Sequence, residues 1–271
     1  MNLLLKPINW SSFGLVLVIL AVLALVFTIL ILLINKFCTV EEDPRISEVA
    51  ENLSGANCGG CGFAGCSDFA KALVEGRADI NACSATSKEN KQNIATILGA
   101  TVNDTEPMMA VVKCAGDLDA SKVKFDYIGL STCQAKNATL GGDKVCSKGC
   151  LGCGDCAVAC SFEGIKINNG VAFACPSECT ACGSCIKACP KQIITLIPKR
   201  AKIYVACSSE CKGKDVINAC KVGCIGCGLC AKNCPQGAIE MVNNLAVINY
   251  DKCTGCGVCA TKCPRKTIKT I

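Results

Sequence analysis

The chain has 271 residues, 28 of them cysteine and none histidine, with a formal net charge of +6 at pH 7. Without histidine, the usual general base and the Ser-His and Cys-His nucleophile pairs are excluded, so acid–base or nucleophilic catalysis is not expected. Cysteine at this density indicates either a disulfide framework or bound metal.

An apolar segment near the N-terminus predicts a membrane helix. Residues 13–34 are apolar apart from Gly14 and Thr28, and a helix of this length spans a bilayer. The segment is longer than the apolar core of a cleaved signal peptide, and no small-x-small motif follows it. A lipid on Cys38 is a rival anchor, which the Lys-Phe pair before it disfavours. We therefore expect an N-terminal segment, 1–37, that crosses the cell membrane once.

The charges beside this segment indicate its orientation. Only Lys6 precedes it, whereas Lys36 and Arg45 follow it closely. Positive charge marks the cytoplasmic side of a membrane helix, so the C-terminal part of the chain is expected in the cytoplasm. That compartment is reducing and keeps thiols free to bind clusters.

Four cysteines after the anchor have the spacing of a [4Fe-4S] site, which we call the Cys58 set: Cys58, Cys61, Cys66 and Cys83. Apolar spacing over 68–74 predicts a short helix that returns the chain to the fourth cysteine, and 86–100 predicts an amphipathic helix. A linker is expected over 102–107. Residues 38–100 are therefore predicted to form a small helical cluster domain.

Glycines inside this domain formally match a dinucleotide fingerprint at Gly60, Gly62 and Gly65. No predicted strand precedes them, and cysteines lie within and beside the motif, so the glycines are expected to serve the cluster loop. We expect no flavin or nucleotide in this chain.

Four dense cysteine runs in the second half each read C-x-x-C-x-x-C-x-x-x-C. In bacterial two-cluster ferredoxins, three thiolates of such a run bind one cube and the fourth binds the cube of the partner run. Three runs end in proline and the first has Ser161 there, which affects no ligand. The pattern predicts four crossed sets: the Cys150 set (Cys150, Cys153, Cys156, Cys189), the Cys179 set (Cys179, Cys182, Cys185, Cys160), the Cys224 set (Cys224, Cys227, Cys230, Cys263) and the Cys253 set (Cys253, Cys256, Cys259, Cys234).

Zinc and disulfides are the alternatives for these runs. Structural zinc uses pairs of C-x-x-C, not triplets with a crossing fourth ligand. Four complete runs in repeated order therefore favour iron–sulfur clusters over both alternatives.

A tandem duplication underlies these runs, because cysteines from Cys133 onward recur 74 residues later. In this register Cys133 and Cys146 correspond to Cys207 and Cys220, and the four are candidate ligands of a sixth cluster. Alignment of the apolar strands 109–114 and 202–207 instead pairs Cys114 with Cys207, so Cys114 is a candidate to replace one of them. The alternative is buried thiols left by duplication. Free thiols are expected at Cys38, Cys175 and Cys211.

The order of these parts resembles the B subunit of the Rnf electron-transport complex, also called the ion-translocating ferredoxin:NAD oxidoreductase. The likeness rests on the membrane helix, the Cys58 set and the C-terminal ferredoxin runs, of which this chain has two modules, as in longer family members. It implies a subunit of a translocase that accepts electrons from reduced ferredoxin and passes them through the Cys58 cluster to partner subunits. Flavins, the NADH site and the ion path are implied to lie in those partners.

The expected fold is α+β, with a transmembrane helix, a small helical [4Fe-4S] domain and tandem two-cluster ferredoxin modules. Five [4Fe-4S] clusters are expected, with a sixth as a candidate. Expected partners are reduced ferredoxin, other complex subunits and the bilayer, but no nucleic acid. Beyond the anchor and small domain, the predicted ranges are 101–145 for a linker and cysteine-bearing insertion, 146–200 for the first ferredoxin module and 201–271 for the second.

Basic residues near the last run are either a docking site for an acidic ferredoxin or a solvated face of the module. These basic residues are Lys252, Lys262, Arg265, Lys266 and Lys269.

Two other functions stay open for the chain: the electron-input subunit of a hydrogenase-linked or anaerobic reductase, and an iron–sulfur scaffold or sensor.

Overall fold

The computed structural model describes residues 10–37, 43–101 and 106–271. It divides into one unit that ends at Pro44 and a second from Arg45 to Ile271. Cys38 and residues 102–105 of the predicted linker lie outside the described residues.

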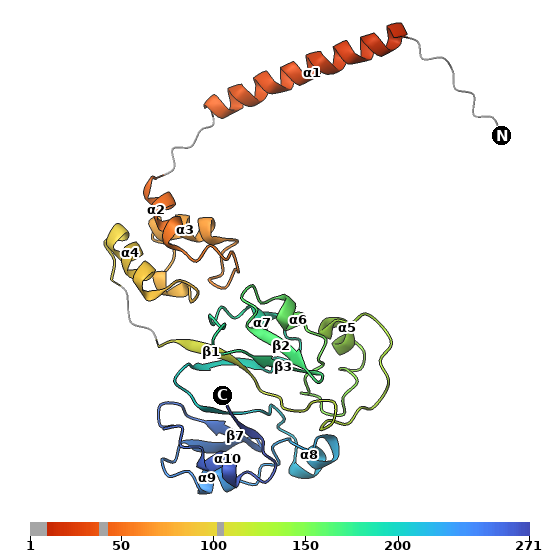
Figure 1. Ribbon diagram of the computed structural model, residues 1–271, viewed down its shortest axis with the longest axis vertical. Coiled ribbons are helices and arrows are strands. Elements are labelled where there is room, and N and C mark those ends of the chain that lie inside the picture. The colour runs from red at the N-terminus through yellow and green to blue at the C-terminus, as the bar shows by residue number, and fades with distance from the viewer. Residues whose placement is uncertain (1–9, 38–42, 102–105) are drawn as a thin grey trace, which may run out of the picture. The chain divides into compact units, whose positions relative to one another are not determined.

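The first unit contains helix α1 (Trp10–Phe37), drawn in red in Figure 1. The 21 residues Gly14–Ile34 have a mean hydropathy of 3.5 and are not buried by other parts of the chain. At about 1.5 Å per residue, this stretch is long enough for the hydrocarbon core of a bilayer. The hydroxyl of Thr28 donates to the Ala24 carbonyl at 2.7 Å, so it is satisfied without water. The helix has the length and composition of a membrane anchor.

The small domain consists of short helices (Figure 1), and these helices enclose an apolar core. The side chains of Val49, Phe69 and Ile94 are at most 1% exposed in this core. Ser87 caps the last helix by accepting from the Asn90 N–H at 3.2 Å, and Gly99 ends it in a left-handed conformation. The helices are α2 (Arg45–Asn52), α3 (Cys66–Val74), η1 (Ile80–Ala82) and α4 (Lys88–Leu98). The predictions at 68–74 and 86–100 correspond to α3 and α4, whereas α2 was not predicted.

The first ferredoxin module consists of two antiparallel strand pairs and two short helices. Strands β2 (Ile165–Asn168) and β3 (Val171–Ala174) lie side by side (Figure 1). Strand β1 (Met108–Val112) pairs with β4 (Ile194–Pro198), so the module's first and last strands are neighbours. Because β1 falls inside 101–145, the range predicted as linker and insertion supplies an edge of this module. Helices α6 (Asp155–Val158) and α7 (Ser184–Ala188) follow the dense cysteine loops.

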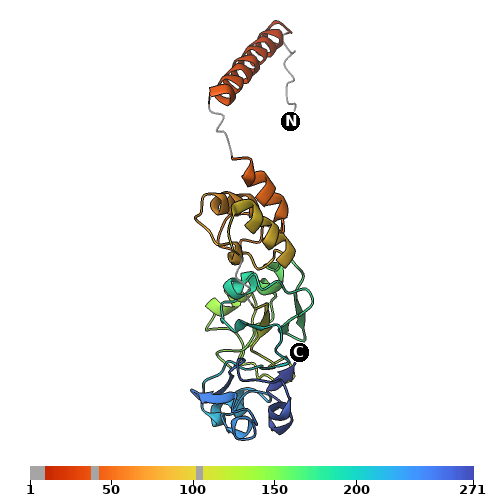
Figure 2. The ribbon, with the colours of Figure 1, turned by 90° about the vertical axis from the view of Figure 1, so that its left-hand side faces the viewer.

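The second ferredoxin module repeats this plan, in blue in Figures 1 and 2. Its outer pair is β5 (Ile203–Val205) with β8 (Ile268–Thr270), and its inner pair is β6 (Ile239–Val242) with β7 (Leu245–Ile248). Its loop helices are α9 (Leu229–Lys232) and α10 (Val258–Lys262). The α+β class with ferredoxin-type modules is therefore confirmed.

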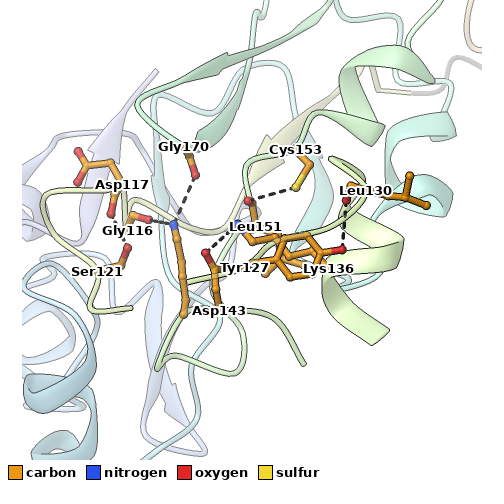
Figure 3. A network of polar contacts seen from close by, with 11 residues as sticks. Gly116, Asp117, Ser121, Tyr127, Leu130, Lys136, Asp143, Leu151, Cys153 and Gly170 are labelled. Carbon is orange, nitrogen blue, oxygen red and sulfur yellow. Dashed lines mark hydrogen bonds and ion pairs between the residues drawn. The ribbon is translucent and has the colours of Figure 1, made fainter. Parts of the chain in front are cut away.

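The modules differ in the segment before their first dense run. In the second module this segment carries α8 (Gly213–Ala219). The longer segment of the first module carries α5 (Cys133–Ala138), whose first turn donates to the Asp155 carboxylate from the Cys133 N–H at 2.8 Å. An ion pair of 2.7 Å between Lys136 and Asp143 joins α5 to the loop that follows it (Figure 3).

Candidate cluster sites

The loops that carry the dense runs depend on glycine in left-handed conformations. Gly152 has φ +72° and Gly226 has φ +69°. A Cβ on Gly152 would lie 2.5 Å from the Gly170 oxygen, and one on Gly226 would lie 2.9 Å from the Asn244 oxygen. Both loops therefore pass close to the hairpin beside them, in a backbone conformation that side chains disfavour.

The Cys150 set faces a cavity of about 20 Å³ in the first module, which Cys150, Cys156 and Cys189 line. Cys133 lines it too, so this thiol lies beside the Cys150 set and not with Cys146. Burial, then the neighbouring Cys150 and Cys133 thiols, raise the pKa of Cys156 to about 12. Burial and Cys133 likewise raise the pKa of Cys153 to about 11. Three of the four predicted ligands and one additional thiol therefore line this cavity, and Cys153 lies near that additional thiol, Cys133.

The Cys179 set also includes its crossing ligand. Burial, followed by the nearby thiols of Cys179, Cys182 and Cys160, raises the pKa of Cys185 to about 11. Backbone N–H groups donate to two of these sulfurs: Ala110 to Cys179 at 3.2 Å and Gly164 to Cys160 at 3.3 Å. Cys160 therefore lies with the run that follows its own.

The two sets of the second module each line one cavity. A cavity of about 20 Å³ is lined by the complete Cys224 set. Another of about 10 Å³ is lined by the complete Cys253 set. Both fourth ligands again lie with the partner run, and their sulfurs accept backbone N–H groups, from Thr267 to Cys263 at 3.4 Å and from Ala238 to Cys234 at 3.3 Å.

Hydrogen bonds stabilise the thiolate form of Cys263. Burial raises its pKa, but N–H groups of Thr267, Arg265 and Ile268 and the Thr267 side chain together hold the pKa of Cys263 below its usual value. A cluster ligand must be deprotonated, so these donors favour binding.

The two modules differ in how far their thiols reach the surface. Cys227 and Cys256 of the second module are exposed, whereas the corresponding Cys153 and Cys182 of the first are half-buried. Clusters in the second module would therefore be more accessible to a soluble redox partner.

The Cys58 set lines a cavity of about 10 Å³ in the small domain. The buried hydroxyl of Thr86 donates to the Cys83 sulfur at 3.2 Å. Asn57 accepts from the Cys66 N–H at 2.8 Å, which fixes the start of α3. All four predicted ligands meet here.

Cys182, from the Cys179 set, lines the same cavity. A Cβ on Gly60 would lie 2.7 Å from the Cys182 carbonyl oxygen, so only glycine allows this approach. The Ser184 hydroxyl donates to the Cys58 carbonyl at 3.3 Å. This junction brings two predicted cluster sites together, and sequence reasoning did not anticipate it.

A fifth cavity, of about 80 Å³, lies between the two modules and is called here the central cavity. Four of its thiols are Cys114, Cys146, Cys207 and Cys220. Cys211, expected to be a free thiol, lines it as well but is exposed. Among the candidate ligands of a sixth cluster, Cys114 lines the central cavity, whereas Cys133 lines the cavity of the Cys150 set.

The donor chemistry of these sites fits iron–sulfur clusters. All 27 described cysteines are free thiols, and twenty of them fall into five sets of four. Cys175, which follows β3, belongs to none of these sets. Among residues 10–37, 43–101 and 106–271, no group of three or more Cys, His, Asp or Glu side chains is placed to hold a single metal ion.

Comparison with known families locates iron–sulfur domains in the chain. Residues 53–85 match the model of an Fe-S cluster family. Residues 176–192 match a 4Fe-4S binding domain, and residues 223–267 match a 4Fe-4S dicluster domain. The three segments contain predicted ligands from the Cys58 set and from both modules, and the matches support iron–sulfur clusters in this chain.

Curated relatives resemble the chain over most of its length. The B subunit of the Na(+)-translocating ferredoxin:NAD(+) oxidoreductase complex of Acetobacterium woodii is 38% identical over 86% of this chain and 71% of its own. The B subunit of the proton-translocating ferredoxin:NAD(+) oxidoreductase complex of Clostridium ljungdahlii is 39% identical over 86% and 83%. The B subunit of an ion-translocating oxidoreductase complex of Methanosarcina acetivorans is 39% identical over 73% and 75%.

Proposed function

The chain belongs to the family of B subunits of ion-translocating oxidoreductase complexes, and from that premise we propose the route that electrons take through it. The family and its iron–sulfur domains make the chain an iron–sulfur electron-transfer subunit of such a complex. We infer that the five sets hold five [4Fe-4S] clusters. Reduced ferredoxin delivers electrons to the second module, and the Cys58 site passes them to partner subunits in the membrane.

Each [4Fe-4S] cluster, when bound, takes up and releases one electron. The chain's part is to hold the clusters, exclude water and donate hydrogen bonds to sulfur. The N–H groups of Ala110, Gly164, Ala238 and Thr267 perform the last task. Such donors stabilise negative charge on the ligand sulfurs and thereby favour the reduced state.

The exposure of the predicted ligands indicates the direction of electron transfer. The second module has exposed ligands at Cys227 and Cys256, and at the far end of the series Cys182 contacts the loop of the Cys58 set. Electrons therefore enter where thiols are accessible and leave through the domain that follows the anchor in the chain.

The anchor supports a membrane location for this transfer. Helix α1 suits a single span, and Lys36 and Arg45 follow it, which favours a cytoplasmic position for the modules. Clusters assemble on free thiols, which the cytoplasm maintains.

Ferredoxin docking can be tested by reversing two exposed charges. Lys262 and Lys266 lie beside the last ligand run. Arg265 is unsuitable for this test because its guanidinium donates to the Cys220 carbonyl. We expect Lys262→Glu with Lys266→Glu to slow ferredoxin oxidation about tenfold at low salt and to flatten its salt dependence.

The control applies the same charge change elsewhere, at the exposed Lys71 and Lys122. Rates should stay near the wild-type value in that variant. Equal rates in both double variants, measured by stopped-flow absorbance, would contradict docking at this end.

A second test distinguishes an electron-transfer subunit from a scaffold protein whose clusters are labile. Clusters of an electron-transfer subunit should stay with the chain when apo-ferredoxin is added, and membrane subunits should copurify with it. Ready transfer of clusters to the acceptor would argue against the proposal.

A further inference from the structure

Sulfur atoms from both ferredoxin modules meet in the central cavity. Both the Cys114 and Cys220 sulfurs lie within 4 Å of the position that a Cβ on Gly116 would occupy, at 3.7 and 3.3 Å. The Cys146 thiol interacts electrostatically with those of Cys114 and Cys220, and the Cys207 thiol with that of Cys146. The cavity is the largest of those that the five sets and these thiols line, at about 80 Å³ against 10 to 20 Å³.

The four thiols are equivalent pairs from two copies of one module. Cys114 follows β1 and Cys207 follows β5, the matching first strands. Cys146 and Cys220 each precede the first cysteine of a dense run by four residues. Cys211 has no cysteine at the matching place in the first module under either the strand alignment or the 74-residue repeat. The duplication therefore supplies two ligands from each module.

Backbone hydrogen bonds repeat the same equivalence. The Cys150 N–H points to the Cys114 sulfur at 3.4 Å, and the Cys224 N–H points to the Cys207 sulfur at 3.4 Å. Cys160, Cys179, Cys234 and Cys263 receive backbone N–H groups in this way, and all four are predicted cluster ligands. Cys114 and Cys207 thus share a feature of the assigned ligands.

The walls of the central cavity join the modules directly. Ala115 N–H donates to the Ala206 carbonyl at 3.0 Å, beside Cys114 and Cys207. Ser121 and Cys220 form an antiparallel bridge. The thiols are therefore held by backbone that both modules stabilise, as a preorganised ligand set requires.

A buried lysine beside the cavity supplies positive charge. Lys144 is 2% exposed, and its Nζ donates to the carbonyls of Gly116 at 2.6 Å and Gly170 at 3.4 Å, both drawn in Figure 3. Its charge acts on the Cys114 and Cys150 thiols. A buried cation needs nearby negative charge, which thiolate-bound clusters at Cys114 and Cys150 would provide.

The geometry points to a sixth [4Fe-4S] cluster in the central cavity, bound by Cys114, Cys146, Cys207 and Cys220. Its ligands contact Cys150 on one side and Cys224 on the other. The cluster would therefore connect the Cys224 set of the second module with the Cys150 set of the first. This inference extends the proposed function and depends on its five-cluster assignment.

Iron content of the full-length protein, purified anaerobically, tests the inference and the five-cluster assignment separately. Six clusters require about 24 iron atoms per chain and five require about 20. A value near 24 is expected. A value near 20, or zinc in the cavity, would overturn the sixth cluster and leave the other five. A value far below 20 would overturn both.

Two double variants identify the ligands. Cys146→Ser with Cys220→Ser should lose about four irons and leave the Mössbauer spectrum of the remaining [4Fe-4S] clusters unchanged. The matched control, Cys175→Ser with Cys211→Ser, also removes two thiols outside the five sets and should keep all the iron. Loss of four irons in the control instead would overturn the ligand set. If the first variant does not fold, the wild-type iron content decides alone.

Discussion

At the scale of single residues, Lys144 is the buried charge that most directly affects the clusters. The charge of its ammonium group acts on both the Cys114 and the Cys150 thiols. A cation stabilises the added electron of a reduced cluster, so Lys144→Met should lower the reduction potential of the nearby clusters by roughly tens of millivolts. The measurement is an EPR-monitored potential titration. The exposed Lys122→Met serves as control, and potentials that match the wild type in both variants would contradict this role.

Gly60 is the residue on which the junction with the small domain depends. Its φ is not positive, so the close Cys182 carbonyl alone requires glycine there. Gly60→Ala should weaken the contact by about 1–3 kcal/mol, as overpacking does, and slow reduction of the Cys58 site. Hydrogen exchange of residues 58–66 and stopped-flow reduction would measure the two effects.

The control for this junction is Gly14→Ala, where the added Cβ would have no atom within 4 Å. Exchange and reduction rates should stay near wild type in that variant. Unchanged exchange in Gly60→Ala would show that the junction is not tightly packed.

Spacing along the chain predicted the crossed sets, and the structure brings Cys263 and Cys234 to their partner runs because each lies beyond the loop of its own run. Their role as cluster ligands stays a prediction. Cys133 shows where this reasoning fails. The 74-residue register counts residues across the longer segment that carries α5, and it pairs Cys133 with Cys207 although their surroundings differ. The alignment of β1 with β5 does not cross that segment, and it pairs Cys114 with Cys207, two thiols that line the same cavity.

At the scale of elements, the domains differ in what fills their cores. The small domain packs Val49, Phe69 and Ile94 between helices. That core includes one buried cysteine, Cys83, whereas the cores of the modules include more, such as Cys156 and Cys185 in the first and Cys230 and Cys259 in the second. Clusters should therefore contribute much of the stability of the modules but less of that of the small domain.

Removal of iron by an anaerobic chelator should unfold the strand pairs β1–β4 and β5–β8 while α3 and α4 keep much of their structure. Hydrogen exchange followed by mass spectrometry would locate the loss. Equal loss of protection in α4 and β1, or full protection of β1 without iron, would contradict this division.

Helices with regular apolar spacing, α3 and α4, could be predicted from sequence, as could the strands before Cys114 and Cys207. The pairing of β1 with β4 could not, because it joins segments that are far apart in the chain and leaves no local periodicity. The contact of Gly60 with Cys182 has the same cause, since domain docking depends on shape and not on spacing.

At the scale of the whole molecule, the predicted cluster sites form a connected series. The Cys253 and Cys224 sets share the second module, the central cavity links it to the Cys150 set, and Cys182 of the Cys179 set contacts the small domain. The resemblance to the Rnf B subunit, inferred from the order of modules, is confirmed by relatives of 38–39% identity. A series of this kind suits transfer between a soluble carrier and membrane partners.

The most direct test of this electron route is a low-temperature EPR redox titration of the anaerobically purified, full-length protein. We predict several [4Fe-4S] signals that broaden one another as neighbouring clusters are reduced in turn. One or two isolated signals, or zinc in place of iron, would contradict the central claim that the chain is a multi-cluster electron-transfer subunit.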